Sequence, residues 1–254
     1  MIEFDLIFYA LAIPSVVLIG LSKGGFAGSG AVALPLMTIA AEPLQVAAVL
    51  LPILLMLDVF AVGLYRKDFD RTTILYTLPT SILGVGLAWL VASRVEPAYF
   101  KILIGIIGIV FTLNIWLRPK SASKLRGHSV VRGGFWGAVT GFTSFITLTG
   151  GPPFQIYVLP LRLPHRTYAG TFIIFMAINN VMKIGPFASL GQFSMNTFWA
   201  SLSLAPLALI STFAGAYLIK HVSSVVFYRI IHAIMFVVCA KLLFDGVSEI
   251  FFSG

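Results

Sequence analysis

The feature that most constrains this chain is a succession of long apolar runs separated by short polar stretches. Crossing the hydrocarbon core of a bilayer takes a helix of ~20 mostly apolar residues, and an open strand there would leave backbone groups unpaired. We therefore predict an all-α polytopic membrane protein. The expected segments lie at about 4–22, 30–41, 44–64, 72–92, 99–117, 130–147, 152–161, 167–190, 196–219 and 224–246.

The composition favours a single transmembrane domain over residues 1–254. Hydrophobic residues make up 59% of the chain, charged residues 10%, and the mean hydropathy is +0.99. Soluble domains carry about 25% charged residues, so this chain has too few charges to cover a water-facing surface. Its formal net charge of +8 comes from basic residues in short loops. That placement is typical of cytoplasmic loops and excludes nucleic acid as the expected partner.

Two of the segments, 30–41 and 152–161, are too short to cross the bilayer comfortably. We expect them to be broken or re-entrant half-helices, each packed as a hairpin against the segment before it. The predicted fold is thus about eight full transmembrane helices plus two half-helices.

The two halves of the chain match each other in order, which indicates a duplication. Repeat one covers about 4–117, a cytoplasmic loop about 118–129, and repeat two about 130–246. Five segments per half is an odd number, so the second copy enters the membrane upside down. Inverted repeats of this kind recur in secondary transporters, which bind substrate near the midplane where helices are broken. The matching positions are Gly20 with Gly141, Gly30 with Gly151, Pro43 with Pro164, Ala48 with Ala169, Asp58 with Asn179, and Pro79 with Pro206.

Basic residues orient the predicted helices. The stretch 118–132 carries five Arg or Lys residues, and the excess of positive charge in cytoplasmic loops places it inside the cell. Counting segments outward from this loop puts the other basic loops on the same side and both termini outside. We expect a multi-pass protein of the bacterial inner membrane, surrounded by the lipid bilayer.

Glycine-rich turns precede both half-helices and are candidate substrate sites. Four glycines within residues 24–30 make a poor helix interior, at about 1 kcal/mol each relative to Ala. A break in a membrane helix persists where its backbone faces protein or a wet cavity, and the N–H groups of the half-helix that follows favour an anion. The candidates are Lys23, Gly24, Gly25, Gly28, Ser29 and Gly30 in the first turn, and Thr149, Gly150 and Gly151 in the second, with Thr149 as the helix N-cap.

The same glycines also fit a packing role. Small residues spaced by four allow helices in a membrane to approach closely. Two series have this spacing: Gly20, Gly24 and Gly28, and Gly133, Gly137 and Gly141. The binding and packing interpretations are compatible, because the first series runs into the turn.

Two charged residues, Asp58 and Lys183, lie inside apolar segments. A charge at the helix centre costs ~2.5–3.5 kcal/mol on insertion scales, so such residues are functional by default. We predict that Lys183 is the counter-charge of an anionic substrate and that Asp58 is its partner or a proton carrier. Asn179 and Asn180 add polar groups for binding, and Gly185-Pro186 breaks the same helix just beyond. The alternative is a purely structural ion pair.

The sequence gives little reason to expect an enzyme. No cluster of His, Cys and carboxylate residues has the spacing of metal ligands, and the single cysteine, Cys239, has no orienting carboxylate nearby. We expect no metal, no cofactor and no enzyme activity. An intramembrane enzyme would have to use Asp58 with Lys183, the one titratable pair predicted at membrane depth.

A series of glycine- and proline-rich motifs extends over nearly the whole chain. The motifs are Ser22-Lys23-Gly24-Gly25-Phe26-Ala27-Gly28, Leu34-Pro35-Leu36, Leu51-Pro52-Ile53-Leu54, Met56-Leu57-Asp58 and Tyr65-Arg66, then Gly141-Phe142, Gly150-Gly151-Pro152, Asn179-Asn180 and Lys183. Together they resemble the TauE/SafE family of sulfite exporters. The resemblance implies movement of sulfite, sulfonates or other small organic anions. One departure is Gly28-Ser29-Gly30, where the family has a near-continuous glycine run and the Ser29 side chain changes the size of any pocket.

The leading hypothesis is a secondary transporter that exports small sulfur-containing or organic anions by alternating access. An inside-negative potential drives each exported negative charge by ~2.3 kcal/mol per 100 mV, so an anion can leave without a coupled ion. Coupling to protons or sodium ions is left open, as is the oligomeric state. An anion channel is the main alternative, and it would need a continuous polar pore.

Overall fold

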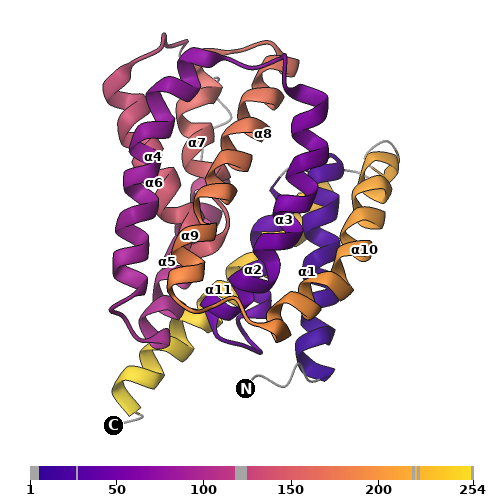
Figure 1. Cartoon of the computed structure of the whole chain (residues 1–254), viewed down its shortest axis with the longest axis vertical. Helices are drawn as coiled ribbons and strands as arrows, with labels where there is room; N and C mark the ends of the chain where they lie inside the picture. Colours follow the sequence, from indigo (N-terminus) through magenta and orange to yellow (C-terminus); the bar gives the residue numbers. More distant parts are fainter. Residues whose placement is uncertain (1–5, 27, 118–124, 219–220, 222–223, 253–254) are drawn as a thin grey trace. The chain divides into compact units, whose positions relative to one another are not determined.

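The computed structural model describes residues 6–26, 28–117, 125–218, 221 and 224–252. Within these ranges the chain is helical with short turns and contains no strand (Figure 1), which confirms the all-α prediction. The expected termini at residues 1–5 and 253–254, and residues 118–124 of the expected cytoplasmic loop, lie outside the described residues. The elements are α1 (Leu6–Gly24), η1 (Ser29–Val32), α2 (Ala33–Met37), α3 (Pro43–Tyr65), α4 (Arg71–Ala92), α5 (Pro97–Leu117), α6 (Val130–Thr147), α7 (Gly151–Val158), η2 (Leu159–Leu161), α8 (His165–Met182), α9 (Ile184–Ser189), α10 (Met195–Leu218) and α11 (Ser224–Phe252).

The helix boundaries lie close to those expected from the apolar runs. The two short segments are indeed short: η1 with α2 in the first half, and α7 with η2 in the second. Two long segments differ from expectation. The run 167–190 is divided into α8 and α9, and α11 extends to Phe252, beyond the expected end at 246.

Seven stretches of the described chain are long and apolar enough to cross a membrane. They are α1, α3, α4, α5, the stretch His165–Ser189, α10, and Val226–Phe251 of α11. Helix α6, which we expected to be a full span, is not among them although it has 18 residues. Its glycines, its threonines and Arg132 lower its mean hydropathy. The glycines instead allow α6 to pack closely against α4.

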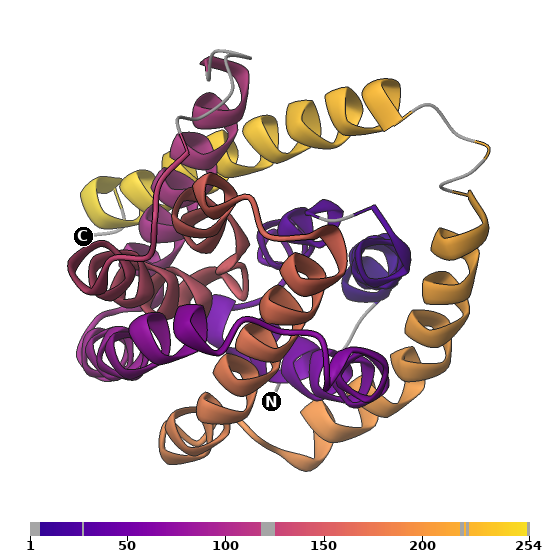
Figure 2. The same ribbon diagram turned by 90° about the horizontal axis from the view of Figure 1, so that it is seen from above.

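The chain divides into two compact units. Unit 1 comprises Met1–Leu57, Val95–Trp116 and Phe187–Gly254, and unit 2 comprises Asp58–Arg94 and Leu117–Pro186. Each unit therefore draws helices from both halves of the sequence. In unit 2, α4 and α6 pack along each other, and α7 and α8 complete the core. In unit 1, α1 packs along α10, while α11 covers η1 and α2 (Figure 2).

Glycines produce the close contact of α4 with α6 in unit 2. A Cβ atom added to Gly137 would lie 2.2 Å from the Thr77 carbonyl oxygen, and one added to Gly141 would lie 2.1 Å from the Ser81 carbonyl oxygen. Real Cβ atoms essentially never approach so closely, so only glycine fits either position. The packing role expected for the series that contains Gly137 and Gly141 is therefore confirmed.

A matching contact joins α1 to α10 in unit 1. A Cβ atom on Gly20 would lie 2.6 Å from the Ala208 carbonyl oxygen, and one on Gly24 would lie 2.2 Å from the Thr212 carbonyl oxygen. Gly20 aligns with Gly141 in the proposed duplication, and Ala208 aligns with Ser81, two residues beyond the matched prolines. The duplication stays a prediction, and this pair of equivalent contacts is in its favour.

A partly exposed cap joins the start of α4 to the loop before α6. The Asp70 carboxylate accepts hydrogen bonds from the Thr73 backbone N–H at 2.7 Å and from the His128 ring at 2.8 Å. Burial alone would raise the pKa of Asp70, but hydrogen bonds from Thr73 and His128 outweigh burial and hold the pKa below its ordinary value. The carboxylate is thus well suited to cap the first turn of α4.

The predicted orientation can be tested with single cysteines in a Cys239→Ser background. Cys239 is buried against Gly108, and serine is close to it in size. We expect Gly127→Cys to react with impermeant maleimide only from the cytoplasmic side, because it lies in the most basic loop. Gln192→Cys should react only from the outside. Labelling of whole cells and inverted vesicles measures this, and reaction of both positions from the same side would contradict the topology.

Candidate functional site

The candidate site in unit 2 is centred on a helix break at Lys183. Helix α8 ends at Met182, Lys183 is its C-cap, and α9 starts at Ile184. Pro186 favours the break, because its ring would clash with the Met182 carbonyl group in a continuous helix and it has no N–H to donate. The predicted break at Gly185-Pro186 thus falls three residues earlier, on the charged residue itself.

An amide bridges the two intramembrane charges. The Lys183 Nζ atom donates a hydrogen bond to Asn180 Oδ1 at 2.8 Å, and Asn180 Nδ2 donates to Asp58 Oδ2 at 2.6 Å. Asp58 and Lys183 also have other contacts. The bond between Asn180 and Asp58 joins α8 to α3. Lys183 and Asp58 therefore belong to one hydrogen-bonded network, with Asn180 as the bridge.

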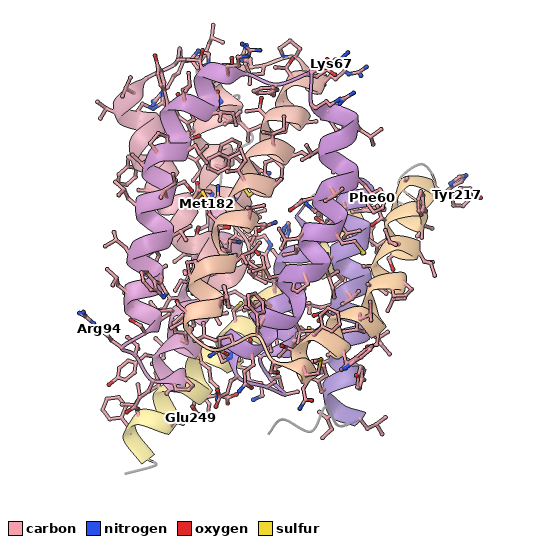
Figure 3. All side chains as sticks on the ribbon, viewed as in Figure 1. Phe60, Lys67, Arg94, Met182, Tyr217 and Glu249 are labelled. Atoms are coloured by element: carbon pink, nitrogen blue, oxygen red, sulfur yellow. The ribbon has the colours of Figure 1, made fainter. Side chains whose placement is uncertain are left out.

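The network is buried and lies midway along unit 2. The relative exposure is 0% for Lys183, 3% for Asp58 and 5% for Asn180. Figure 3 shows Met182, the residue before Lys183, about midway between Lys67 at one end of the unit and Arg94 at the other. A buried charge is costly unless it is paired and hydrogen-bonded, and the bridge supplies that compensation.

Asn179 lies in a structural tie rather than in this bridge. Ser81 Oγ donates to Asn179 Oδ1 at 2.7 Å, and Asn179 Nδ2 donates to the Phe175 carbonyl oxygen at 3.1 Å. Both ends of the amide are thus engaged, and the pair ties α8 to α4. Ser81 was not predicted from the sequence. Its hydroxyl lies in an apolar run, and a membrane-buried amide such as Asn179 needs a hydrogen-bond partner of this kind.

The first glycine-rich turn, in unit 1, folds back on the end of α1. Gly25 and Gly28 have φ angles of 142° and 97°, a left-handed region that favours glycine. The Gly28 N–H donates to Ser22 Oγ at 3.2 Å, and Ser29 Oγ donates to the Leu18 carbonyl oxygen at 3.0 Å. The Ser29 hydroxyl therefore anchors η1 on α1.

The predicted ligands of the first turn differ in their surroundings. Lys23 lies in the last turn of α1. Gly24 is packed against the backbone of α10, and a Cβ atom on Gly30 would meet Ile19 at 3.4 Å. Gly28 is exposed, with open space where a Cβ atom would lie. Gly28 is thus the position in this turn whose backbone a ligand could approach most freely.

The second turn, in unit 2, corrects the expected helix cap. Gly150, not Thr149, is the N-cap of α7, and no side chain caps it. Thr149 Oγ1 instead donates to the Thr147 carbonyl oxygen at 3.2 Å, because Leu148 turns the chain with a φ of 54°. The expected prolines do occupy the first turn of α7, where a missing N–H costs nothing.

Gly150 and Gly151 lie in packed surroundings. A Cβ atom on Gly150 would come within 2.9 Å of Ser144 and Thr140, and one on Gly151 would lie 3.3 Å from the Phe172 ring. The structure thus groups the predicted residues into the Lys183 network and the α6–α7 turn in unit 2, and the α1–η1 turn in unit 1. The expected convergence of the two turns stays a prediction. No group of His, Cys and carboxylate residues within the described ranges could hold a metal ion.

Comparison with known proteins identifies the family. The family model described as "Sulfite exporter TauE/SafE" matches residues 12–242. Comparisons with curated proteins and with solved structures give no match. The family match covers most of the chain, and it contains five of the seven apolar stretches of membrane-crossing length in full and most of the first and last. The chain is therefore a multi-pass membrane protein that belongs to the TauE/SafE family of sulfite exporters.

Proposed function

We propose that this protein is a secondary transporter that exports small oxyanions of sulfur or organosulfonates by alternating access, with Lys183 as the counter-charge of the anion. The observation that carries the proposal is a fully buried ammonium group at a break between two helices. In secondary transporters, substrates bind near the midplane at such discontinuous helices. Membership of an exporter family supports the same direction of transport.

The bridge suggests how an anion is bound and released. Asn180 links the Lys183 ammonium group to the Asp58 carboxylate. An ammonium group is a compact charge with three rotatable donors, so it can turn from Asn180 to an oxyanion without moving its helix. Asp58 then acts as the internal anion that stabilises Lys183 when no substrate is present.

The membrane potential supplies the driving force for export in this proposal. An inside-negative potential favours the exit of each negative charge by ~2.3 kcal/mol per 100 mV. A monoanion that binds the neutral pair of Lys183 and Asp58 gives a loaded protein with one net negative charge at the site. Its outward step is then driven by the potential, without a coupled cation.

Flux measurements on proteoliposomes test the proposed function. Vesicles are loaded with sulfite, sulfoacetate or a short-chain carboxylate, and an outward potassium gradient with valinomycin makes the interior negative. We expect saturable efflux of the sulfur anions that the negative potential accelerates. External substrate should also stimulate exchange, which is a property of a carrier. Efflux that never saturates would favour the channel alternative, and the absence of flux for every sulfur anion would contradict the proposal.

A further inference from the structure

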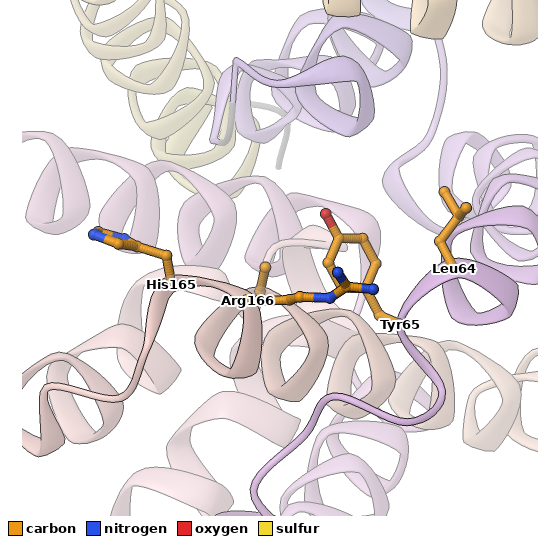
Figure 4. Close-up of a pocket in the computed structure, with 5 residues that line it drawn as sticks. Leu64, Tyr65, His165 and Arg166 are labelled. Carbon is orange, nitrogen blue, oxygen red and sulfur yellow. The ribbon is translucent and has the colours of Figure 1, made fainter.

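A groove opens at the end of unit 2, between the end of α3 and the start of α8. It has a volume of about 380 Å³ and is lined by Leu64, Tyr65, His165, Arg166 and Ala169 (Figure 4). Figure 4 shows the Arg166 side chain extending from α8 toward Tyr65, whereas the His165 ring is directed away from them. The groove is therefore defined chemically by Tyr65 and Arg166, with Leu64 as an apolar wall.

The polar groups in the groove are hydrogen-bond donors. Arg166 donates from Nε to Asp68 Oδ2 at 2.9 Å, and a guanidinium group has further N–H donors on its two terminal nitrogens. The Tyr65 hydroxyl forms no hydrogen bond within the described part of the chain. The groove also adjoins the N-terminus of α8, which carries partial positive charge. Arginine donors of this geometry match the oxygens of a planar or tetrahedral oxyanion.

The loop beside the groove is held in place by contacts other than the Asp68–Arg166 pair. The Asp68 backbone carbonyl approaches Gly170 so closely that a Cβ atom there would lie 1.9 Å from the carbonyl oxygen. The Asp70 N–H donates to Thr171 Oγ1 at 2.8 Å. An ion pair as exposed as Asp68–Arg166 contributes little to stability, so the groove keeps its form when either charge is removed.

Helices α3 and α8 connect this groove to the Lys183 network. Tyr65 lies seven residues after Asp58 on α3, which is about 10 Å along a helix. Ala169 lies eleven residues before Asn180 on α8, and the bond between Asn180 and Asp58 joins the same two helices. The groove and the buried network thus both lie between α8 and the last turns of α3, from Asp58 to Tyr65.

Resting on the proposed function, we propose that the groove formed by Tyr65 and Arg166 is a receiving site, which binds the oxyanion on the cytoplasmic side before it reaches Lys183. The charge placement that puts the neighbouring basic loops inside the cell also puts the groove there. Asp68 limits the strength of this site, because it engages Arg166 and repels an arriving anion.

The test compares two charge removals that have opposite expected effects. With sulfite and sulfoacetate as probes, we expect Arg166→Gln to raise KM from the cytoplasmic side about three- to tenfold, the range of a lost hydrogen bond. Asp68→Asn should lower the same KM, because it releases Arg166. The maximal rate should be unchanged in both variants, since the Lys183 network is intact. Tyr65→Phe should raise KM as well, by less than Arg166→Gln.

Controls separate this inference from its alternatives. Arg162→Gln removes a nearby exposed charge outside the groove and should leave KM unchanged. A purely structural ion pair would make Arg166→Gln and Asp68→Asn change KM and thermal stability in the same direction, and that result would overturn the inference. An effect seen only in vesicles with phosphatidylglycerol, and absent in phosphatidylcholine, would assign the groove to lipid headgroups instead. If the wild type transports the anion but no variant changes KM, the receiving site is overturned and the proposed function stands. If the wild type shows no flux, the proposed function itself is overturned.

Discussion

Lys183→Met should abolish anion flux, and adding Asp58→Asn should restore stability but not transport. The single substitution leaves the buried Asp58 carboxylate without its counter-charge, and breaking one partner of a buried pair costs about 3–5 kcal/mol. The double variant has neither charge, so its melting temperature should return toward that of the wild type. It also has no counter-charge for the substrate, so its flux should stay at background. Lys183→Arg should keep part of the flux, because the charge survives while the geometry changes.

The measurements are thermal unfolding in detergent and sulfite flux in proteoliposomes for the wild type and these three variants. Arg94→Met is the control, because Arg94 is an exposed cation in the turn that follows α4. Surface substitutions of this kind usually change stability by less than about 0.5 kcal/mol, so neither stability nor flux should change appreciably. A double variant that transports at the wild-type rate would exclude Lys183 as the anion site and leave the pair a structural role.

Gly141→Ala should destabilise the protein by about 1–3 kcal/mol, the usual range for overpacking. The added Cβ atom would lie 2.1 Å from the Ser81 carbonyl oxygen, so α4 and α6 would have to separate. Ser81 also donates to Asn179 beside the Lys183 network, and its displacement should lower flux as well. The loss of stability and the loss of flux should therefore occur together in this variant.

Gly63→Ala provides a control of opposite sign. Gly63 is exposed on α3, with open space where its Cβ atom would lie. Alanine is favoured over glycine in a helix by up to about 1 kcal/mol, so this variant should be as stable as the wild type or more stable. Thermal unfolding of the purified variants measures both effects. Equal melting temperatures for the Gly141→Ala and Gly63→Ala proteins would show that the α4–α6 contact is not the stabilising interface.

The helical segments could be predicted from the sequence because a bilayer leaves few alternatives. Every crossing segment has to be helical and apolar, so the runs of apolar residues mark the helices directly, and the run 72–92 coincides with α4 to within one residue. Asp58 and Lys183 could be predicted for the same reason, since a charge is conspicuous in an apolar run. Pro186 lies three residues after the break, but Pro14, Pro52, Pro79 and Pro206 lie inside continuous helices, so a proline alone does not locate a break.

The partners of these residues were decided by the tertiary structure alone. Asn179 and Asn180 are neighbours of the same type, yet one step along a helix is a rotation of about 100°. Asn180 therefore faces Asp58 on α3, while Asn179 faces Ser81 on α4. The same holds for the glycines, because Gly24 packs on α10 and Gly28 is open only as a result of which helix lies opposite. Hydropathy determines that a segment crosses the membrane, but it is nearly independent of rotation about the helix axis, and that rotation selects the contacts that form the site.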